Sequence, residues 1–426
     1  MTRQLAPPAR VGTARPTSLW RSRNFLLLWS GQTVSELGTR ISGIAIPLLA
    51  ANDLDASVFQ ISLLTFLAWL PYLLFSLPAG ILADRVDQRR LMIFCDLGRM
   101  ALMLSLPLVA LGGKLTLWYL YGVVGLSGVL TVLFTVAYRS RLPRLVAADQ
   151  LVDANAKLGM SQEFAELVGA SIGGALIGLV GAARTFFSNG IAFLVSALTL
   201  WLIRETPAER EPAEPDAARV PLRTAMIDGL AFVRHQPILR LILACTTTSN
   251  FFVMASGSIE VTFMVRELHA SSMLVGLVFT LSALGGLVAG ALASRLSGWI
   301  GSARIIWVAM AAPGPLYLLM PLAQPGWGVL LYGLGLAAFS ANAVLFNVAA
   351  MTYRQRITPP GLLGRVNAAF LWICLGAVPL GALFGGVLGS RLGLRETLWI
   401  CVLGTWSAAL FVVFSPLRKM RDMVPD

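Results

Sequence analysis

Long apolar stretches alternate with short polar segments along most of the chain. A helix needs about 20 apolar residues to cross the hydrocarbon core of a bilayer. Hydrophobic residues make up 57% of the 426 residues and charged residues only 13%, whereas soluble domains carry about 25% charged residues. The pattern predicts an all-α membrane protein with twelve transmembrane helices, at residues 24–51, 58–82, 90–111, 115–138, 158–181, 185–203, 238–264, 273–297, 303–323, 327–351, 362–389 and 395–416.

Several features of the chain occur twice, about half a chain apart. The segment GILADRVDQRR at 80–90 has a degenerate copy, GALASR, at 290–295. Glycine-rich stretches in the fifth and eleventh spans, and a Tyr-Arg-x-Arg sequence at the ends of the fourth and tenth, repeat at similar offsets. Such repeats are typical of transporters built from two related halves. We therefore expect two pseudo-symmetric halves of six helices each.

The polar segments divide the chain into parts. A Pro-, Glu- and Ala-rich stretch after the sixth span is predicted to link the halves. Residues 222–240 have apolar positions at helical spacing, and they either form a separate helix at the membrane surface or extend the seventh span; Pro237 favours a break. The predicted parts are a cytoplasmic tail at 1–22, an N-terminal half at 23–203, a cytoplasmic linker at 204–222, a C-terminal half at 223–417 and a cytoplasmic tail at 418–426.

The basic residues predict the orientation. Most of the 33 lysines and arginines fall in the two tails and in the loops after the even-numbered spans, and cytoplasmic loops are enriched in basic residues. The connection after the first span carries Asp53 and Asp55 instead. Residues 1–22 lack the short apolar core of a secretory signal. We expect a multi-pass protein of the cell (inner) membrane with both termini in the cytoplasm.

Residue types exclude several other functions. Basic loops beside a membrane explain the net charge of +12, so membrane lipids rather than nucleic acid are the expected partners. The four cysteines lie singly in apolar segments and the two histidines lie far apart, which predicts neither a disulfide nor a metal site. We recognise no phosphate-binding loop, nucleophile–base pair or cofactor motif. The chain is therefore predicted not to be an enzyme, and no cofactor is expected.

Ionisable residues inside the spans are candidates for proton coupling. Glu36 lies about midway along the first span, and Glu260 lies toward the outer end of the seventh. Ionisable groups at such depths normally face a cavity or a partner. We predict proton coupling at Glu36, Arg40 and Glu260. The alternative is a purely structural ion pair between Glu36 and Arg40, one helical turn apart. Glu163 and Glu166, near the start of the fifth span, are expected to cap that helix or form salt bridges between the halves.

Polar and aromatic stripes on four spans predict a central substrate cavity. Ser35 and Glu36 correspond to Ser249 and Asn250 at an offset of 214 residues, so both halves can offer polar groups to one cavity. An apolar pocket with a few oriented polar groups suits a small-molecule ligand. Each residue could instead serve only helix packing. The candidates are Gln32, Ser35, Thr39, Ser127, Thr131, Phe134, Tyr138, Asn250, Met254, Asn342, Phe346 and Asn347.

The charged hairpin after the second span is a candidate conformational latch. Its glycine permits close helix approach, its aspartate can accept hydrogen bonds at a helix N-terminus of the other half, and its arginines can bind carboxylates or lipid headgroups. Asp96 and Arg99 lie one turn apart and are expected to form an ion pair of the same network. The alternative is a basic cytoplasmic loop with no further role. The predicted latch consists of Gly80, Asp84, Arg85, Arg89, Arg90, Asp96 and Arg99.

With these motifs the chain resembles the major facilitator superfamily. The hairpin matches the loop signature of that superfamily at Gly80, Asp84, Arg85, Arg89 and Arg90. The stretches from Leu142 to Asn155 and from Asp228 to Arg234 are similar to the third drug:proton antiporter group, which includes macrolide-efflux and siderophore-export proteins. The fifth span lacks the Gly-Pro signature common in antiporters, and the fourth lacks their embedded basic residue.

The resemblance implies a secondary active transporter that works by alternating access. It implies proton-coupled export of an amphipathic organic compound such as an antibiotic, drug or siderophore, with protons as the second partner. Twelve spans can enclose a complete pathway, so a monomer is expected. Two alternatives are a facilitator or importer of a small metabolite, and a non-transporting membrane receptor.

Overall fold

The computed structural model describes residues 19–147, 150–204 and 222–422, and within these ranges it contains helices but no strand. The first half comprises η1 (Leu19–Arg21), α1 (Arg23–Leu48), the π-helix η2 (Leu49–Asp53), α2 (Val58–Arg85), α3 (Gln88–Leu111), α4 (Leu117–Leu145), α5 (Leu151–Val180) and α6 (Ala182–Leu202). The second comprises α7 (Leu222–His235), α8 (Pro237–Arg266), α9 (Ser272–Ile300), α10 (Arg304–Ala311), α11 (Gly314–Tyr317), α12 (Leu319–Leu322), α13 (Gly328–Ile357), α14 (Pro360–Leu392), α15 (Leu394–Ser407), α16 (Ala409–Val413) and η5 (Pro416–Lys419).

Within the described residues, twelve helical segments are long and apolar enough to cross a membrane, as the hydropathy pattern predicts. The ninth span is broken into α10, α11 and α12, because Pro313 and Pro315 cannot donate to a helical ladder. Gly314 lies directly against the indole of Trp406, whose Nε1 donates to the Ala311 carbonyl oxygen at 3.0 Å. The Trp406 side chain therefore packs against the break in the ninth span: it contacts Gly314 and donates to a carbonyl oxygen freed by the break.

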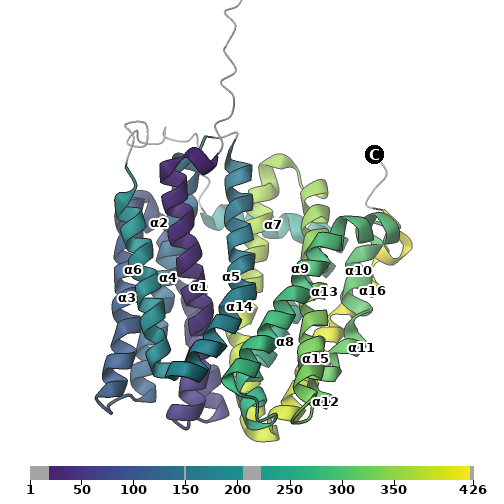
Figure 1. The fold of residues 1–426 in the computed structure, drawn as a ribbon. Coiled ribbons are helices and arrows are strands. Elements are labelled where there is room, and N and C mark those ends of the chain that lie inside the picture. The colour runs from purple at the N-terminus through teal and green to yellow at the C-terminus, as the bar shows by residue number, and fades with distance from the viewer. Residues whose placement is uncertain (1–18, 148–149, 205–221, 423–426) are drawn as a thin grey trace, which may run out of the picture.

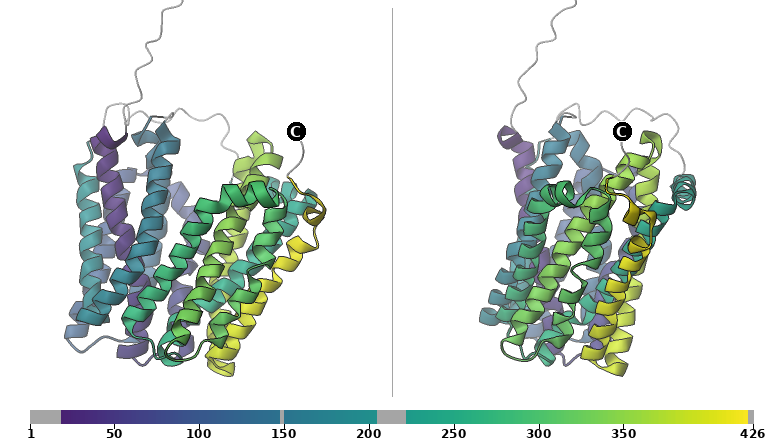
Figure 2. Two further views of the ribbon diagram at one scale, coloured as in Figure 1. Left: turned by 45° about the vertical axis from the view of Figure 1, so that its right-hand side comes forward. Right: turned by 90° about the vertical axis from the view of Figure 1, so that its right-hand side faces the viewer.

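A separate helix precedes the seventh span, which confirms the break favoured by Pro237. Helix α7 ends at His235, and Pro237 is the first residue of α8. In the right-hand view of Figure 2, α7 is seen nearly end-on and so runs crosswise to the spans. An ion pair between Asp228 and Arg365 (2.7 Å) ties it to α14.

The helices form two bundles that stand side by side (Figure 1). In the first bundle α6 packs on α1 and α3, and α4 packs on α2 and α3; in the second, α13 packs on α9, and α14 and α15 pack on α8. The described ends of the chain, η1 and η5, lie at the same end of the molecule, uppermost in Figure 1. Residues 205–221, which hold most of the predicted linker, lie outside the described residues.

Two helix pairs make the most extensive contacts between the bundles, α5 with α9 and α2 with α14. The α5–α9 contact is close at Gly174 and Gly276: a Cβ on Gly276 would lie 2.5 Å from the Ala170 carbonyl oxygen. On the α2 side, the Ser62 hydroxyl donates to the Ser258 carbonyl oxygen of α8 at 3.3 Å. These contacts lie from the middle of the molecule toward the end opposite the termini.

The connections at that end also join the bundles. Arg266, the last residue of α8, donates to the Ala56 carbonyl oxygen at 2.7 Å. Ala56 is fully buried in the connection between η2 and α2. The halves are therefore closed against each other at the end opposite the termini.

Candidate functional site

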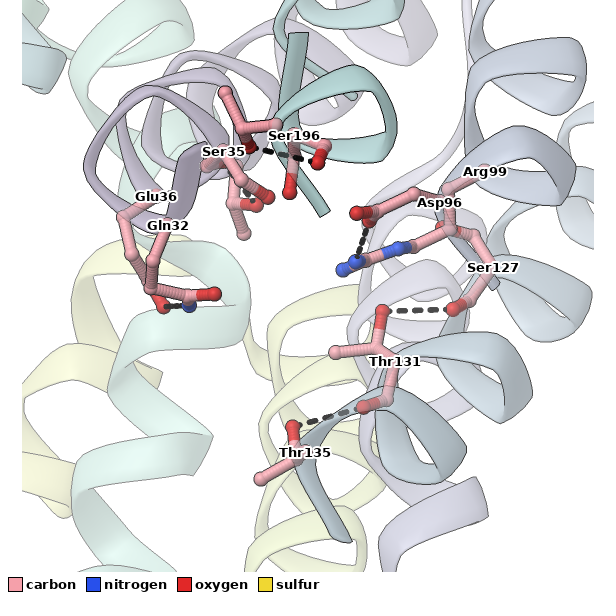
Figure 3. A network of polar contacts seen from close by, with 11 residues as sticks. Gln32, Ser35, Glu36, Asp96, Arg99, Ser127, Thr131, Thr135 and Ser196 are labelled. Atoms are coloured by element: carbon pink, nitrogen blue, oxygen red, sulfur yellow. Dashed lines mark hydrogen bonds and ion pairs between the residues drawn. The ribbon is translucent and has the colours of Figure 1, made fainter. Parts of the chain in front are cut away.

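Helix α1 packs two of its faces inside the first half. Gly31 and Gly38 lie against α6, and Arg40 and Ile41 lie against glycines of α5. Ser35 is buried on the α6 side, beside Ser196 in Figure 3. Ser35 was predicted to line the cavity, and this prediction is wrong for the present structure.

The remaining face of α1 carries Gln32, Glu36, Thr39 and Gly43, of which Gln32, predicted to line the cavity, is buried. Figure 3 shows Gln32 and Glu36 directed away from Ser35 and Ser196. Thr39 is exposed, and a Cβ on Gly43 would meet no atom within 4 Å. This face, here called the free face of α1, is the part of the helix that neither α5 nor α6 covers.

Glu36 is half-buried on the free face and has one hydrogen-bond donor. The Gln32 amide Nε2 donates to its Oε1 at 3.0 Å. Among the residues that the structure describes, no cation forms an ion pair with Glu36. The guanidinium of Arg40 instead forms an ion pair with Glu166 of α5. The alternative pairing of Glu36 with Arg40 is therefore wrong, as is a salt bridge of Glu166 between the halves, because α1 and α5 belong to the same half.

Helix α8 presents a matching free face in the second half. Thr246, Asn250 and Gly257 stand 214 residues after Gln32, Glu36 and Gly43, and a Cβ on Gly257 would also meet nothing within 4 Å. The half-buried Met254 lies one turn from Asn250. Helices α1 and α8 contact each other across the two bundles, and Asn250 stands on α8 where α1 has its acid.

A hydroxyl stripe on α4 lies near the free face of α1. The Thr131 hydroxyl donates to the Ser127 carbonyl oxygen and the Thr135 hydroxyl to the Thr131 carbonyl oxygen, both at 2.8 Å (Figure 3). Thr39 similarly donates to the Ser35 carbonyl oxygen at 2.9 Å. These hydroxyl protons are occupied within their own helices, so the stripe offers oxygen acceptors rather than donors to a ligand.

Two half-buried tyrosines accompany Glu36. The Tyr72 hydroxyl of α2 lies near Thr135, and the Glu36 carboxylate acts electrostatically on the hydroxyls of both Tyr72 and Tyr138. Each ring has an aromatic neighbour: Trp69 lies 5.3 Å from Tyr72, and Phe134 is stacked 6.4 Å from Tyr138. Tyr138 was predicted from the sequence, whereas Tyr72 was not.

The predicted ion pair between Asp96 and Arg99 is present and fully enclosed by the first half. The Arg99 guanidinium lies between the rings of Phe134 (4.4 Å) and Phe193 (4.3 Å), and Ser196 lies near Asp96. Phe134 was predicted to line the cavity, but its ring packs on Arg99 inside the bundle. Among the described residues, the contacts of this pair lie within the first half and none joins it to the hairpin.

The latch arginines also bind within the first half in this conformation. Arg89 donates its Nε to the Leu200 carbonyl oxygen at 2.9 Å, and its Nη2 to that of Trp201. Arg90 pairs with Asp87, which caps the N-terminus of α3. Arg85 is exposed. The side chains at positions 80 and 84 lie outside the described residues, so the latch across the halves stays a prediction.

The second half encloses three of its candidates. Asn342 donates to the Tyr317 hydroxyl, and both residues are buried. Phe346 is buried in the cluster around α10, α13 and α14. Glu260 is buried on α8, where it accepts a hydrogen bond from Tyr332 of α13 at 3.3 Å. Asn342 and Phe346 were wrongly predicted to line the cavity, whereas Asn347 is exposed.

Several relevant residues escaped the sequence analysis. Tyr72, Tyr332 and Phe193 are aromatic residues within strongly apolar spans, and nothing local distinguishes them from residues that only pack. Serines within apolar spans commonly hydrogen-bond to their own helix, so Ser196 is equally inconspicuous. Within the described ranges, no group of three His, Cys, Asp or Glu side chains is arranged to hold a metal ion.

Curated proteins resemble the chain along nearly its full length. The chain is 26% identical over 394 residues to the MFS-type transporter YfiS of Bacillus subtilis, covering 90% of this chain and 91% of that protein. It is 21% identical to the macrolide efflux protein A of Streptococcus pyogenes (95% and 98% covered). It is 26% identical to the multidrug efflux pump Tap of Mycolicibacterium fortuitum (96% and 99% covered).

Solved structures share the fold. A bacterial homologue of the lysosomal transporter Spinster, in an inward-facing and occupied conformation, matches with a TM-score of 0.72 at 17% identity, covering 93% of this chain and 97% of that one. A bacterial homologue of the iron transporter ferroportin in an inward-facing state matches with a TM-score of 0.72 at 16% identity (93% and 99% covered). The profile of the Major Facilitator Superfamily matches residues 28–379. The chain therefore belongs to the Major Facilitator Superfamily and is a multi-pass membrane transporter rather than an enzyme.

Proposed function

We propose that this transporter exports an amphipathic organic compound in exchange for protons, with Glu36 as the group that binds proton and substrate in turn. The observation that carries the proposal is the position of Glu36 on the free face of α1 without a cationic partner. An unpaired carboxylate inside a membrane is expensive unless it binds a proton or another cation. Relatives named as macrolide and multidrug efflux proteins support the direction and the substrate class.

Alternating access supplies the coupling. The halves meet at the α5–α9 and α2–α14 contacts, and rocking about these contacts would expose the two free faces to one side and then to the other. A substrate bound between the free faces displaces the proton from Glu36, and the empty carboxylate takes up another proton after the pathway opens to the other side. The coupling free energy comes from the differential affinity of the two conformations for each ligand.

Glu260 is a second candidate for proton binding, but unlike Glu36 it does not lie on a free face. Its carboxyl is buried on α8 beside α13, and among the described residues its hydrogen-bond partner is the Tyr332 hydroxyl. Ser258, two residues before it, accepts the hydrogen bond from Ser62 of the other half. A proton at Glu260 would therefore act on the contact between the halves rather than on the substrate directly.

The proposal is tested by transport of the dye ethidium in everted membrane vesicles that contain the protein. An imposed pH gradient, acidic inside, should drive protein-dependent dye uptake, and nigericin, which collapses the gradient, should stop it. Transport that continues unchanged without a gradient would identify a facilitator and contradict proton coupling. The absence of protein-dependent flux of ethidium and of other amphipathic dyes, with the protein correctly inserted, would favour a receptor.

Two matched variants assign the coupling residue. Glu36→Gln keeps the size of the side chain but cannot titrate, so it should abolish both active uptake and substrate-induced proton release measured in detergent. Glu260→Gln should retain proton release on substrate binding. Loss of release only in Glu260→Gln would move the coupling site to the second half.

The cytoplasmic location of both termini remains part of the proposal. The four native cysteines are buried, so engineered cysteines can be labelled with little background. In intact cells, a membrane-impermeant maleimide should label Lys114→Cys, at the end opposite the termini, but not Arg3→Cys. The reverse labelling would invert the orientation.

A further inference from the structure

We propose that α7 is a membrane-surface helix that binds anionic phospholipid headgroups and thereby fixes the depth of the eleventh span in the bilayer. The helix lies crosswise to the spans, at the edge of the molecule rather than on its uppermost end (right-hand view of Figure 2). An exposed apolar stripe on α7, exposed arginines beside the stripe, and a close attachment to α14 carry the proposal.

The exposed side of α7 is mostly apolar. Ile227 and Leu230 are 56% and 47% exposed, and Ala231 and Arg234 are exposed as well. These positions follow one another at the spacing i, i+3, i+4 and i+7, so they form one stripe along the helix. Gly229, on the other side of the helix, is buried. An apolar stripe of this kind, on a helix that lies along a bilayer, inserts between the headgroups and the acyl chains.

The level of α7 along α14 matches the boundary between the headgroups and the hydrocarbon. Helix α14 has 33 residues, so it is about 50 Å long and exceeds a centred hydrocarbon core of about 30 Å by roughly 10 Å at each end. Helix α7 contacts α14 at Arg365, which follows the first residue of α14, Pro360, by about 7.5 Å along the helix axis. The apolar stripe therefore lies at the depth to which surface helices insert.

The charges of α7 select anionic headgroups. Arg234 and Arg240 are exposed, and among the described residues no acid forms an ion pair with either. Asp228 is the only acid between positions 227 and 240, and its carboxylate is paired with Arg365. The exposed surface is therefore left with net positive charge, and basic residues beside a bilayer bind anionic lipids. A long arginine side chain can reach the headgroups while its stem lies along apolar surface.

The attachment to α14 transmits the position of α7 to the eleventh span. The Arg365 Nη1 donates to the Asp228 Oδ2 at 2.7 Å. A Cβ on Gly229 would lie 2.3 Å from the Arg365 carbonyl oxygen, so the two helix backbones are in direct contact. Because α14 also packs on α2 of the first half, lipids that hold α7 act on a span that contacts both halves.

Fluorescence quenching by spin-labelled lipid tests the proposal on the full chain in nanodiscs. The four native cysteines are buried, so an environment-sensitive fluorophore can be attached at Leu230→Cys. Pro359→Cys is the control, because this exposed residue directly precedes α14 at the end of the span. Phosphatidylcholine that carries a nitroxide near its headgroup should quench the fluorophore at position 230 at least about threefold more than at position 359. Melting temperatures identify a variant that has lost its fold, and Ile227→Cys then replaces Leu230→Cys.

A second measurement tests the preference for charge. Nitroxide-labelled phosphatidylglycerol, added as a minor component of phosphatidylcholine nanodiscs, should quench position 230 at least about threefold more than labelled phosphatidylcholine at the same fraction. Arg234→Gln combined with Arg240→Gln should remove this excess. Arg418→Gln combined with Lys419→Gln, which removes two exposed charges from η5, should retain it.

Either measurement can overturn the proposal. Equal quenching at positions 230 and 359 would place α7 outside the bilayer and leave its apolar stripe to a protein partner. Equal quenching of position 230 by the two labelled lipids, or an excess that survives the loss of both arginines, would remove the selectivity for anionic headgroups. Both measurements are made without substrate and without a pH gradient, so their results do not depend on proton-coupled export.

Discussion

An alanine at Gly276 should open the end of the molecule opposite the termini. The added Cβ would lie 2.5 Å from the Ala170 carbonyl oxygen and 3.2 Å from the Gly174 Cα of the other half. Carbon–oxygen contacts in proteins settle at about 3.3–3.6 Å, so the α5 and α9 backbones must separate by roughly 0.8–1.1 Å. Because these helices belong to different halves, tilting the halves apart relieves the overlap without disturbing either core.

The size of the shift in the conformational equilibrium follows from the free-energy cost of the overlap. Forcing a methyl group into a closed contact costs about 1–3 kcal/mol. If the open conformation is free of the overlap, that difference shifts the equilibrium toward it by about 5- to 150-fold. Gly174→Ala probes the same contact from the other half, since its Cβ would lie 2.5 Å from the Ser272 carbonyl oxygen. It should shift the equilibrium in the same direction.

Cysteine accessibility measures the shift. Ser62 is fully buried between the halves, so Ser62→Cys should react slowly with an impermeant thiol reagent in cells and much faster when combined with Gly276→Ala. Gly178→Ala is the control: it belongs to the same glycine-rich stretch, but its Cβ would meet nothing within 4 Å. Equal labelling rates in the Gly276→Ala and Gly178→Ala backgrounds, with equal insertion, would refute the reasoning.

Three further outcomes are expected away from the α5–α9 contact. Gly314→Ala should lower the free energy of unfolding by about 1–3 kcal/mol, because its methyl group overlaps the Trp406 indole; an unchanged melting temperature would contradict this. Asp228→Asn should increase proteolysis around α7, although a partly exposed ion pair contributes at most about 1 kcal/mol. The Ser302 backbone N–H holds the pKa of Asp422 below its usual value, so the contribution of this contact is complete at neutral pH and is lost as the pH falls through that lowered pKa. Asp422→Asn should therefore speed amide exchange of Ser302 at neutral pH, and unchanged exchange would show that the carboxylate charge is not needed.

The spans could be predicted from the sequence because membrane crossing depends on local hydropathy and length. The same feature hides the orientation of each helix. Spans that are apolar all round give little periodicity to separate an inner face from a lipid-facing one. Phe134, Asn342 and Phe346 were therefore placed in the pathway although the structure buries them within the halves.

Ion pairs between side chains on different helices could not be predicted from the sequence either. The i,i+4 spacing of Glu36 and Arg40 allows an ion pair within one helix, but Glu166 of α5 reaches the guanidinium instead. Pairings of this kind depend on how α1 and α5 pack, which a single sequence does not encode locally. By contrast, the break in the ninth span could have been predicted, since Pro313-Gly314-Pro315 is a strong helix-breaking signal.

The replacement of an acid by Asn250 on the free face of α8 bears on how membrane voltage acts on the transporter. If Glu36 alone carries either one proton or one monovalent cation, each cycle moves equal charge in both directions. The membrane potential, worth about 2.3 kcal/mol per 100 mV for each elementary charge, then does no net work on the cycle. A pH gradient alone, at about 1.4 kcal/mol per unit, would set the steepest substrate gradient. Asn250→Asp would restore an acid to both halves and make exchange of a monovalent cation for two protons electrogenic.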